Sequence, residues 1–472
     1  MAFSSVEFLF LFLPLFLLFY FGALGLANGI LLGTSLLFYL IGEGWFVFVM
    51  LASILGNFLF GRAIGVAAEG ARRIWLIAGV IANLALLGYY KYIGFLVTSV
   101  LALSSPQAEF ARAIHLPLGI SFFTFQAISY LVDVYRRDTL PETSLVRLGA
   151  YIAMFPQLVA GPIVRFSSVA DSLRSRQVSL WHLYYGLAFF AVGLAAKVLI
   201  ADGLAGYADN VFATPAQDLR GDAALLGVVI YSLQIYFDFL GYSAMAVGLG
   251  LALGFRFPRN FNLPYTAQSV SDFWRRWHMS LSSWFRDYVY IPLGGNRAPL
   301  WRTSLNLWIV FLITGLWHGA AWNFIVWGMY HGAFLTLERI GGARLLGALP
   351  EVLRHLYLCV VVGLGWVLFR AESLSHANDY LVALFRPSGE ITPWTYLTHE
   401  TLGTLLVAML FCTPQVGRWI GKVVELPSYD PWPGTLPRLR VSFGVGIYVL
   451  LIALCTAKIL SGSYSPFIYF RF

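Results

Sequence analysis

Few side chains in this sequence could perform chemistry, because long stretches of it are wholly apolar. The stretch from Phe311 to Gly332 contains no Asp, Glu, Lys or Arg, yet it holds two histidines, His318 and His331. An ionisable side chain at membrane depth is costly and marks a candidate functional site. An imidazole can take a proton from a hydroxyl group while that hydroxyl attacks a carbonyl carbon. We therefore expect His318 to be the general base of an acyl transfer.

The neighbours of His318 suit this role. Gly315 and Gly319 would allow a ligand or a backbone to approach closely, and Trp317 could shield the imidazole. On the residues alone, a buried histidine bonded to a nearby carbonyl is an equally valid interpretation. We expect His331 to be structural, since a single helix from Trp317 onward would place it well away from His318 in angle.

A second informative stretch runs from Val270 to Leu293. Its aromatic residues recur at helical spacing, and a polar stripe follows the same period. The stripe consists of Arg275, His278, Ser282 and Arg286. We interpret the stretch as one amphipathic helix, which either lies in the membrane interface or lines a cavity with its polar face. The basic stripe could meet the phosphates of an acyl donor or lipid headgroups.

The remaining polar groups at membrane depth are Asp238 and Asn323. With Arg275, Arg286 and Trp317 they form our candidate substrate-binding set. For Asp238 a structural ion pair with a nearby Lys or Arg is the favoured alternative.

Other chemistries lack their motifs. The sequence contains no HExxH motif, no Walker A loop and no GxSxG elbow, and its 3 cysteines show no metal spacing. We therefore predict no metal site and no bound cofactor.

The composition predicts an all-α, polytopic membrane protein. Hydrophobic residues make up 59% of the 472 residues and charged residues only 11%, against roughly 25% in soluble domains. The net charge of +8 arises from residues in short loops, so it indicates lipid headgroups and not nucleic acid. The first apolar run lacks a basic n-region, which predicts a retained helix.

Segment lengths predict about eleven spans plus re-entrant pieces, within one domain over residues 1–472. Residues 150–166 are interrupted by Pro156, Gly161 and Pro162, which favours a re-entrant segment over a kinked helix. Residues 223–255 are too many for one straight span. We expect polar loops over residues 101–113, 371–400 and 418–440.

Several ordered motifs resemble the membrane-bound O-acyltransferase family, and within it the bacterial branch that includes the alginate O-acetyltransferase membrane subunit. The similarity covers nearly the whole chain. It is carried by FSSVEFLFLFLPLF, PLGISFFTFQAISYLVDVYR, FPQLVAGPIVRF, YFDFLGYSAMAVGLGLALGFRFPRNFNLPY, DFWRRWHMSLSSWFRDYVYIPLGGNR, GLWHGAAWNFIVWGMYHG and GWVLFRAE. The resemblance implies a multi-helix bundle with a thinned centre, in which a funnel leads to the catalytic His318. It also implies that His278 is a second polar residue of the active site.

One motif departs from the family pattern. Relatives read FDFSGYSDMA where this chain reads FDFLGYSAMA, so Leu240 and Ala244 replace a Ser and an Asp. If that Asp orients donor or acceptor in relatives, this chain uses a different partner or acceptor.

Together these features predict acyl transfer across a bacterial inner membrane. The donor would be a cytoplasmic thioester, acetyl-CoA or another acyl thioester. The acceptor would be a hydroxyl of an exported polysaccharide, alginate- or cellulose-like, or of a periplasmic acetyltransferase that relays the group. His278 or nearby donors would steady the oxyanion. The alternatives are D-alanyl transfer from a carrier protein to a cell-envelope polymer, and a transporter.

Overall fold

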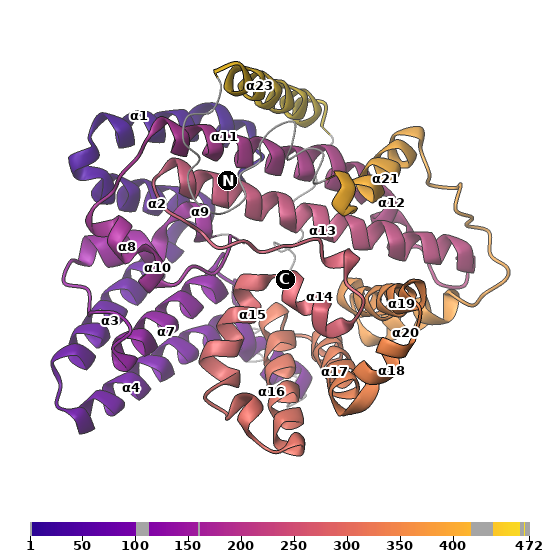
Figure 1. Ribbon diagram of the computed structural model, residues 1–472, viewed down its shortest axis with the longest axis horizontal. Coiled ribbons are helices and arrows are strands. Elements are labelled where there is room, and N and C mark those ends of the chain that lie inside the picture. Colours follow the sequence, from indigo (N-terminus) through magenta and orange to yellow (C-terminus); the bar gives the residue numbers. More distant parts are fainter. Residues whose placement is uncertain (1, 101–112, 159–160, 417–437, 463–466, 468–472) are drawn as a thin grey trace. The chain divides into compact units, whose positions relative to one another are not determined.

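The computed structural model describes residues 2–100, 113–158, 161–416, 438–462 and 467 (Figure 1). In this part of the chain every element is a helix, and the β pairing is limited to one isolated parallel bridge between Leu219 and Ile391. The expected all-α fold is confirmed.

The described chain forms two compact units. The first comprises residues 1–186 and 246–258, and the second residues 187–245 and 259–472. The helices α11 (Leu180–Ala195) and α13 (Gly221–Ala252) contribute residues to both units. The expectation of a single domain over residues 1–472 stays a prediction.

The first unit is built mainly from the N-terminal helices. Its elements are η1 (Phe8–Phe12), α1 (Leu13–Gly22), η2 (Leu24–Leu26), α2 (Ala27–Glu43), η3 (Gly44–Phe46), α3 (Val47–Val66), α4 (Glu69–Leu87), η4 (Gly88–Tyr92), α5 (Ile93–Phe95), η5 (Leu96–Val100), α7 (Ile120–Arg136), α8 (Leu145–Ala153), α9 (Phe155–Leu158) and α10 (Phe166–Arg174).

The interrupted segment of this unit is broken as predicted. The short α9 follows α8 directly, and α10 begins at Phe166, after Pro162. Phe155 is fully buried within a cluster of aromatic rings, and its backbone N–H donates to the Ser35 hydroxyl (3.1 Å). Irregular backbone at membrane depth must be covered by protein or by a water-filled cavity. In the described irregular residues after α9, Ile163 and Val164 are buried (3% and 0% exposed).

The second unit holds both predicted catalytic histidines. After α11 and α13 its elements are η6 (Ala196–Ala201), α12 (Asp202–Ala213), η7 (Pro264–Thr266), α14 (Val270–Arg276), α15 (Met279–Phe285), η8 (Arg286–Tyr290), η9 (Gly295–Arg297), α16 (Leu300–His318), α17 (Trp322–Leu337), η10 (Glu338–Gly342), α18 (Ala343–Ala348), α19 (Glu351–Arg370), α20 (Leu374–Ala383), α21 (His399–Phe411) and α23 (Arg438–Leu460).

Seven helical stretches of the described chain are long and apolar enough to cross a membrane. They are Leu24–Val66, Glu69–Val100, Leu180–Ala213, Gly221–Ala252, Leu300–His318, Glu351–Arg370 and Val441–Leu460. Two shorter apolar helices, Phe8–Gly22 and His399–Phe411, add to them. A membrane protein with many helices is thus confirmed, but the count of about eleven spans is not.

Two loop predictions can be compared with the structure. Residues 371–400 were expected to be a polar loop, yet they contain the helix α20. The Ser373 hydroxyl stabilises the N-terminus of α20, because it accepts a hydrogen bond from the His376 backbone N–H. That prediction was wrong. Most of the loops expected over residues 101–113 and 418–440 lies outside the described residues.

Candidate functional site

A close crossing of α16 and α17 positions the predicted base. The two helices lie side by side (Figure 1). A Cβ atom on Gly315 would lie 2.3 Å from the carbonyl oxygen of Phe324, and one on Gly328 would lie 2.3 Å from that of Phe311. Only glycines permit such backbone contact, as is common between membrane helices. Gly319 then adopts an extended conformation and ends α16.

His318 is the last residue of α16 and is buried (5% exposed). Its ring lies nearly perpendicular to those of Trp317, Trp327 and Phe369, at centroid distances of 4.9, 5.0 and 5.1 Å. The C-terminal end of a helix carries partial negative charge, which stabilises a cation there. The position therefore suits a base that becomes an imidazolium when it takes a proton, inside an enclosure that excludes water.

His331 shares an aromatic neighbour with His318. The angle argument held only if Trp317 to Gly332 formed one helix, and the structure instead ends α16 at His318 and reverses the chain before α17. Trp327 contacts both rings, His318 at 5.0 Å and His331 at 5.1 Å. His331 is buried (1% exposed), and a Cβ on Gly365 of α19 would lie 2.7 Å from its Nε2. Its structural role stays a prediction.

The stretch from Val270 to Leu293 was predicted to be one helix, and this prediction was wrong. It breaks at His278, which adopts the left-handed conformation (φ 44°, ψ 53°) between α14 and α15. A non-glycine residue in this region carries strain of about 1–3 kcal/mol, and such strain clusters at functional sites. The periodicity of the aromatic residues concealed the break, because helical turns on both sides of His278 keep the same spacing.

The break places His278 in the interior of the second unit. Its ring lies 4.6 Å from that of Phe239 on α13 and 5.9 Å from that of Trp317. Trp317 thus touches both predicted catalytic histidines. The structure brings His278, Trp317 and His318 into one cluster, and the catalytic roles of the two histidines stay predictions.

The two arginines of the predicted stripe are not part of this cluster. Arg275 and Arg286 are exposed, and Arg286 pairs with the adjacent Asp287 (2.6 Å). Because the helix breaks at His278, the four residues of the expected stripe do not lie along one helix.

Asp238 forms the buried ion pair that was the favoured alternative. Its carboxylate lies 2.9 Å from the Lys197 ammonium, which also pairs with Asp202 at 2.6 Å, and each of the three side chains is 2% exposed. Lys197 was not identified as a partner from sequence, although its place at the end of an apolar run was a usable signal.

Ala244 lies on α13 where it meets α11. A Cβ atom on Gly193 would lie 3.0 Å from the Ala244 side chain and 2.6 Å from the carbonyl oxygen of Gly241. A carboxylate at position 244 would therefore face a close helix contact here. In this chain Ala244 therefore packs against Gly193 of α11.

Asn323 joins two helices of the second unit. Its side-chain amide donates to the carbonyl oxygens of Ala371 (2.8 Å) and Leu368 (3.4 Å) at the end of α19. Since both amide hydrogens are engaged, Asn323 holds the start of α17 against α19, beside the ring of Phe369 that contacts His318.

Asn260 is the polar residue at this site that sequence reasoning did not single out. It is 2% exposed, and its Oδ1 lies 3.3 Å from the His278 Nδ1. The PRNFNLPY motif was part of the resemblance, and a polar residue between Pro258 and Pro264 was the available signal. As for metals, no group of three or more His, Cys, Asp or Glu side chains that could hold an ion occurs in the described residues.

Fold and site together define a polytopic helical membrane protein with buried histidines in an aromatic enclosure. Residues 138–345 match the model of the MBOAT, or membrane-bound O-acyltransferase, family. The chain is 41% identical to the "Probable alginate O-acetylase" of Azotobacter vinelandii, and the match covers 100% of both chains. It is 37% identical to the peptidoglycan O-acetyltransferase of Helicobacter pylori over 82% of this chain and 80% of the relative.

A more distant relative is the teichoic acid D-alanyltransferase of Bacillus subtilis, 33% identical over 46% of this chain and 58% of the relative. The chain belongs to the membrane-bound O-acyltransferase family. It is accordingly an O-acyltransferase, and the names of its relatives favour acetyl as the group transferred.

Proposed function

We propose that this protein moves an acetyl group from a cytoplasmic thioester, such as acetyl-CoA, to a hydroxyl of an exported polysaccharide. A periplasmic protein that relays the acetyl group is the second form of the acceptor. The proposal places the chain in the inner membrane. It is supported by the relatives named for alginate and peptidoglycan O-acetylation, both of which cover most of this chain.

The observation that carries the mechanism is the aromatic enclosure of His318 at the end of α16. In the proposed reaction His318 takes the proton of the incoming hydroxyl as its oxygen attacks the thioester carbonyl. A C–O bond forms and the C–S bond breaks. The proton then passes from the imidazolium to the leaving thiolate, which departs as a free thiol, so His318 returns to its neutral state.

The enclosure contributes by excluding water from the site. Water that reached the thioester could replace the acceptor hydroxyl and hydrolyse the donor. The rings of Trp317, Trp327 and Phe369 cover the imidazole on the sides where they contact it. Arg275 is exposed and could meet the phosphates of the donor at the surface, or lipid headgroups.

The test is the acetyl-ester content of exported polysaccharide in cells that carry His318→Ala. We expect esters to disappear while the variant accumulates and melts like the wild type. His376→Ala is the matched control, because it removes a histidine that lies on α20, away from the cluster. Unchanged ester content in the His318→Ala strain would refute the role of His318 as the base.

D-alanyl transfer is the second candidate, supported by the relative that acts as a teichoic acid D-alanyltransferase. The same cells distinguish the two functions. Mass spectrometry of the groups released from the polymer by mild base identifies acetate in one case and D-alanine in the other.

A further inference from the structure

The mechanism above makes no use of Asn260. Both polar atoms of its side chain, Oδ1 and Nδ2, form hydrogen bonds. Asn260 Oδ1 accepts from the Ser280 backbone N–H (3.2 Å) and from the Ser280 hydroxyl (2.6 Å), and Nδ2 donates to the Ser243 hydroxyl (3.1 Å). His278 Nδ1 is the further neighbour of Oδ1, at 3.3 Å. A buried amide held by hydrogen bonds to several partners rigidifies its surroundings.

These contacts fix the orientation of the Asn260 amide. The oxygen and nitrogen of an asparagine side chain are assigned from their hydrogen-bond partners. A backbone N–H can only donate, so the amide atom that faces Ser280 N must be the oxygen. If Oδ1 and Nδ2 of Asn260 were exchanged, the side-chain N–H groups would face the backbone N–H of Ser280, and neither could accept a hydrogen bond.

The orientation of Asn260 in turn fixes the tautomer of His278. Because Oδ1 can only accept, Nδ1 of His278 must be the donor in the 3.3 Å contact, which is at the long end for such bonds. A neutral imidazole carries one proton, so its lone pair lies on Nε2. That atom is buried and has no hydrogen-bond partner among the residues that the structure describes.

The backbone holds this arrangement in place. The N–H of Met279 donates to the carbonyl oxygen of Asn260 (2.9 Å), and the N–H of Asn262 donates to that of Arg276 (3.0 Å). These two bonds bracket the left-handed residue His278. The imidazole is therefore directed by contacts on both sides of its own backbone and by the amide beside it.

We propose that Asn260 is a positioning residue, which holds His278 with its lone pair on Nε2 so that His278 accepts a hydrogen bond from substrate. The inference rests on the proposed function and revises one expectation, since a neutral His278 in this tautomer cannot donate to an oxyanion through Nε2. The group it accepts from is a hydrogen-bond donor on a substrate. It is either a hydroxyl of the acceptor or an amide N–H in the carrier arm of the thioester.

The first test reads the tautomer without measuring activity. The protein is labelled with ¹⁵N-histidine and reconstituted in lipid, and the His278 signals are assigned by their loss in His278→Gln. We expect a protonated Nδ1 and an unprotonated Nε2 at neutral pH, and a mixture of tautomers in Asn260→Leu. A protonated Nε2 in the wild type, or a spectrum unchanged by Asn260→Leu, would overturn the proposal.

The second test uses steady-state acyl transfer. Removing a partner that orients an imidazole costs about 10- to 100-fold, a range known for metal-bound histidines, and we expect a loss of this size for Asn260→Leu. Asn260→Asp should recover most of the rate, because a carboxylate also accepts from Nδ1–H and from both Ser280 donors. Asn306→Leu is the matched control, since Asn306 is equally buried and donates to the Leu293 carbonyl instead.

The kinetic constants identify the group that His278 holds. A higher KM for the acceptor alone indicates a hydroxyl, and a higher KM for the thioester alone indicates the carrier arm. If Asn260→Asp is as impaired as Asn260→Leu, or Asn306→Leu as impaired as either, the positioning role is wrong. A wild-type protein without acyl transfer would refute the proposed function, while the NMR measurement would still test the tautomer.

Discussion

At the scale of single residues, His278 combines a buried ring with a backbone conformation that few side chains accept. Its φ of 44° lies in the left-handed region. Asn enters this region more readily than most residues, whereas a β-branched residue is a genuine outlier there. The effect of a substitution at position 278 on stability should therefore depend on how readily the new residue adopts the left-handed conformation, and not only on its hydrophobicity.

This argument predicts the order of two variants. His278→Val should be less stable than His278→Asn by roughly 1 kcal/mol or more, although Val is the more apolar of two side chains of similar size. Denaturation of both purified variants in one detergent measures the difference. Equal stabilities, or the reverse order, would show that the conformation at 278 relaxes at no cost.

Glu142, which lies before α8 and outside the candidate spans, provides a pH-dependent prediction. Burial alone would raise the pKa of its carboxyl group, but hydrogen bonds from the Arg147 guanidinium and from the Ser144 and Thr143 backbone N–H groups hold it below the ordinary value of 4.5. Since folding lowers this pKa, the interaction stabilises the fold above that value and is lost as the pH falls below it.

Glu142→Gln should therefore lower the free energy of unfolding at neutral pH by about 1–3 kcal/mol, because it removes charged hydrogen bonds. The difference between variant and wild type should shrink as the pH falls through the lowered pKa of the wild-type carboxyl. Thermal denaturation across this pH range gives the comparison. A deficit that stays constant with pH would mean that the charge of Glu142 contributes nothing.

The sequence led to His318 and His278 but not to Asn260. His318 is conspicuous because it lies in an apolar run without charged neighbours, and ionisable groups are rare at membrane depth. His278 was identified through the resemblance. Asn260 lies in a short extended segment between prolines, and its importance arises from contacts with Ser243 and Ser280, 17 and 20 positions away. No local pattern encodes such contacts.

At the scale of elements, the hairpin of α16 and α17 depends on glycines at its crossing. Gly315→Ala or Gly328→Ala would bring a methyl group to 2.3 Å from a backbone oxygen that cannot move independently. We expect each variant to lose about 1–3 kcal/mol of stability, the usual cost of overpacking. Acyl transfer should fall as well, since His318 ends the first of these helices.

Gly33→Ala in α2 is the control for this experiment, because a Cβ there would meet nothing within 4 Å. Alanine at such an exposed helical position should raise stability by about 0.5–1 kcal/mol. Melting curves of the three variants in the same detergent give the comparison. If Gly315→Ala melts like Gly33→Ala, the backbones are further apart than described.

The elements also show which patterns could be interpreted from sequence. Apolar runs indicated long membrane helices, and seven helical stretches of the described chain are long and apolar enough to cross a membrane. The break at His278 was missed, because helical periodicity continues across it. The angle argument for His331 did not apply, since it required one helix from Trp317 onward and the chain reverses after His318.

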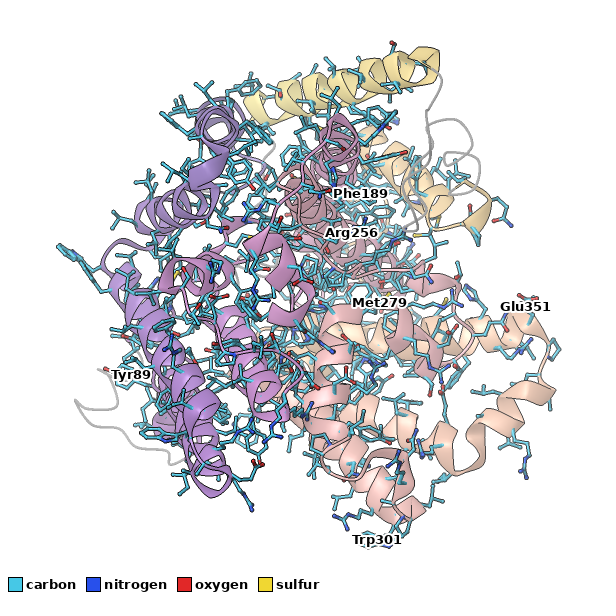
Figure 2. The ribbon with its side chains drawn as sticks, turned by 60° about the vertical axis from the view of Figure 1, so that its left-hand side comes forward. Tyr89, Phe189, Arg256, Met279, Trp301 and Glu351 are labelled. Atoms are coloured by element: carbon cyan, nitrogen blue, oxygen red, sulfur yellow. The ribbon has the colours of Figure 1, made fainter. Side chains whose placement is uncertain are left out.

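At the scale of the whole molecule, large apolar side chains cover the outside of the candidate spans. The spans Glu69–Val100 and Val441–Leu460 are among the least buried, and Figure 2 shows side chains such as Tyr89 projecting outward. A soluble protein does not expose contiguous apolar surface of this extent. Lipid chains are the environment that such surfaces require.

We therefore expect the protein to remain in the membrane fraction after an alkaline carbonate wash and to be released only by detergent. A peripheral protein with the same net charge of +8 would be held by anionic headgroups and released by salt or high pH. Immunoblots of pellet and supernatant decide between these results. Recovery in the carbonate supernatant would contradict the assignment of spanning helices.

The crossing of Gly315 and Gly328 has a consequence for how this chain can evolve. The two residues lie on different helices, Gly315 on α16 and Gly328 on α17, yet a Cβ atom on either would meet a backbone carbonyl of the other helix. A lineage that replaced either glycine would have to move the two helices apart. The remaining position would then no longer require glycine, because no backbone would lie close to it. The two positions should therefore covary, so that both are glycine or neither is.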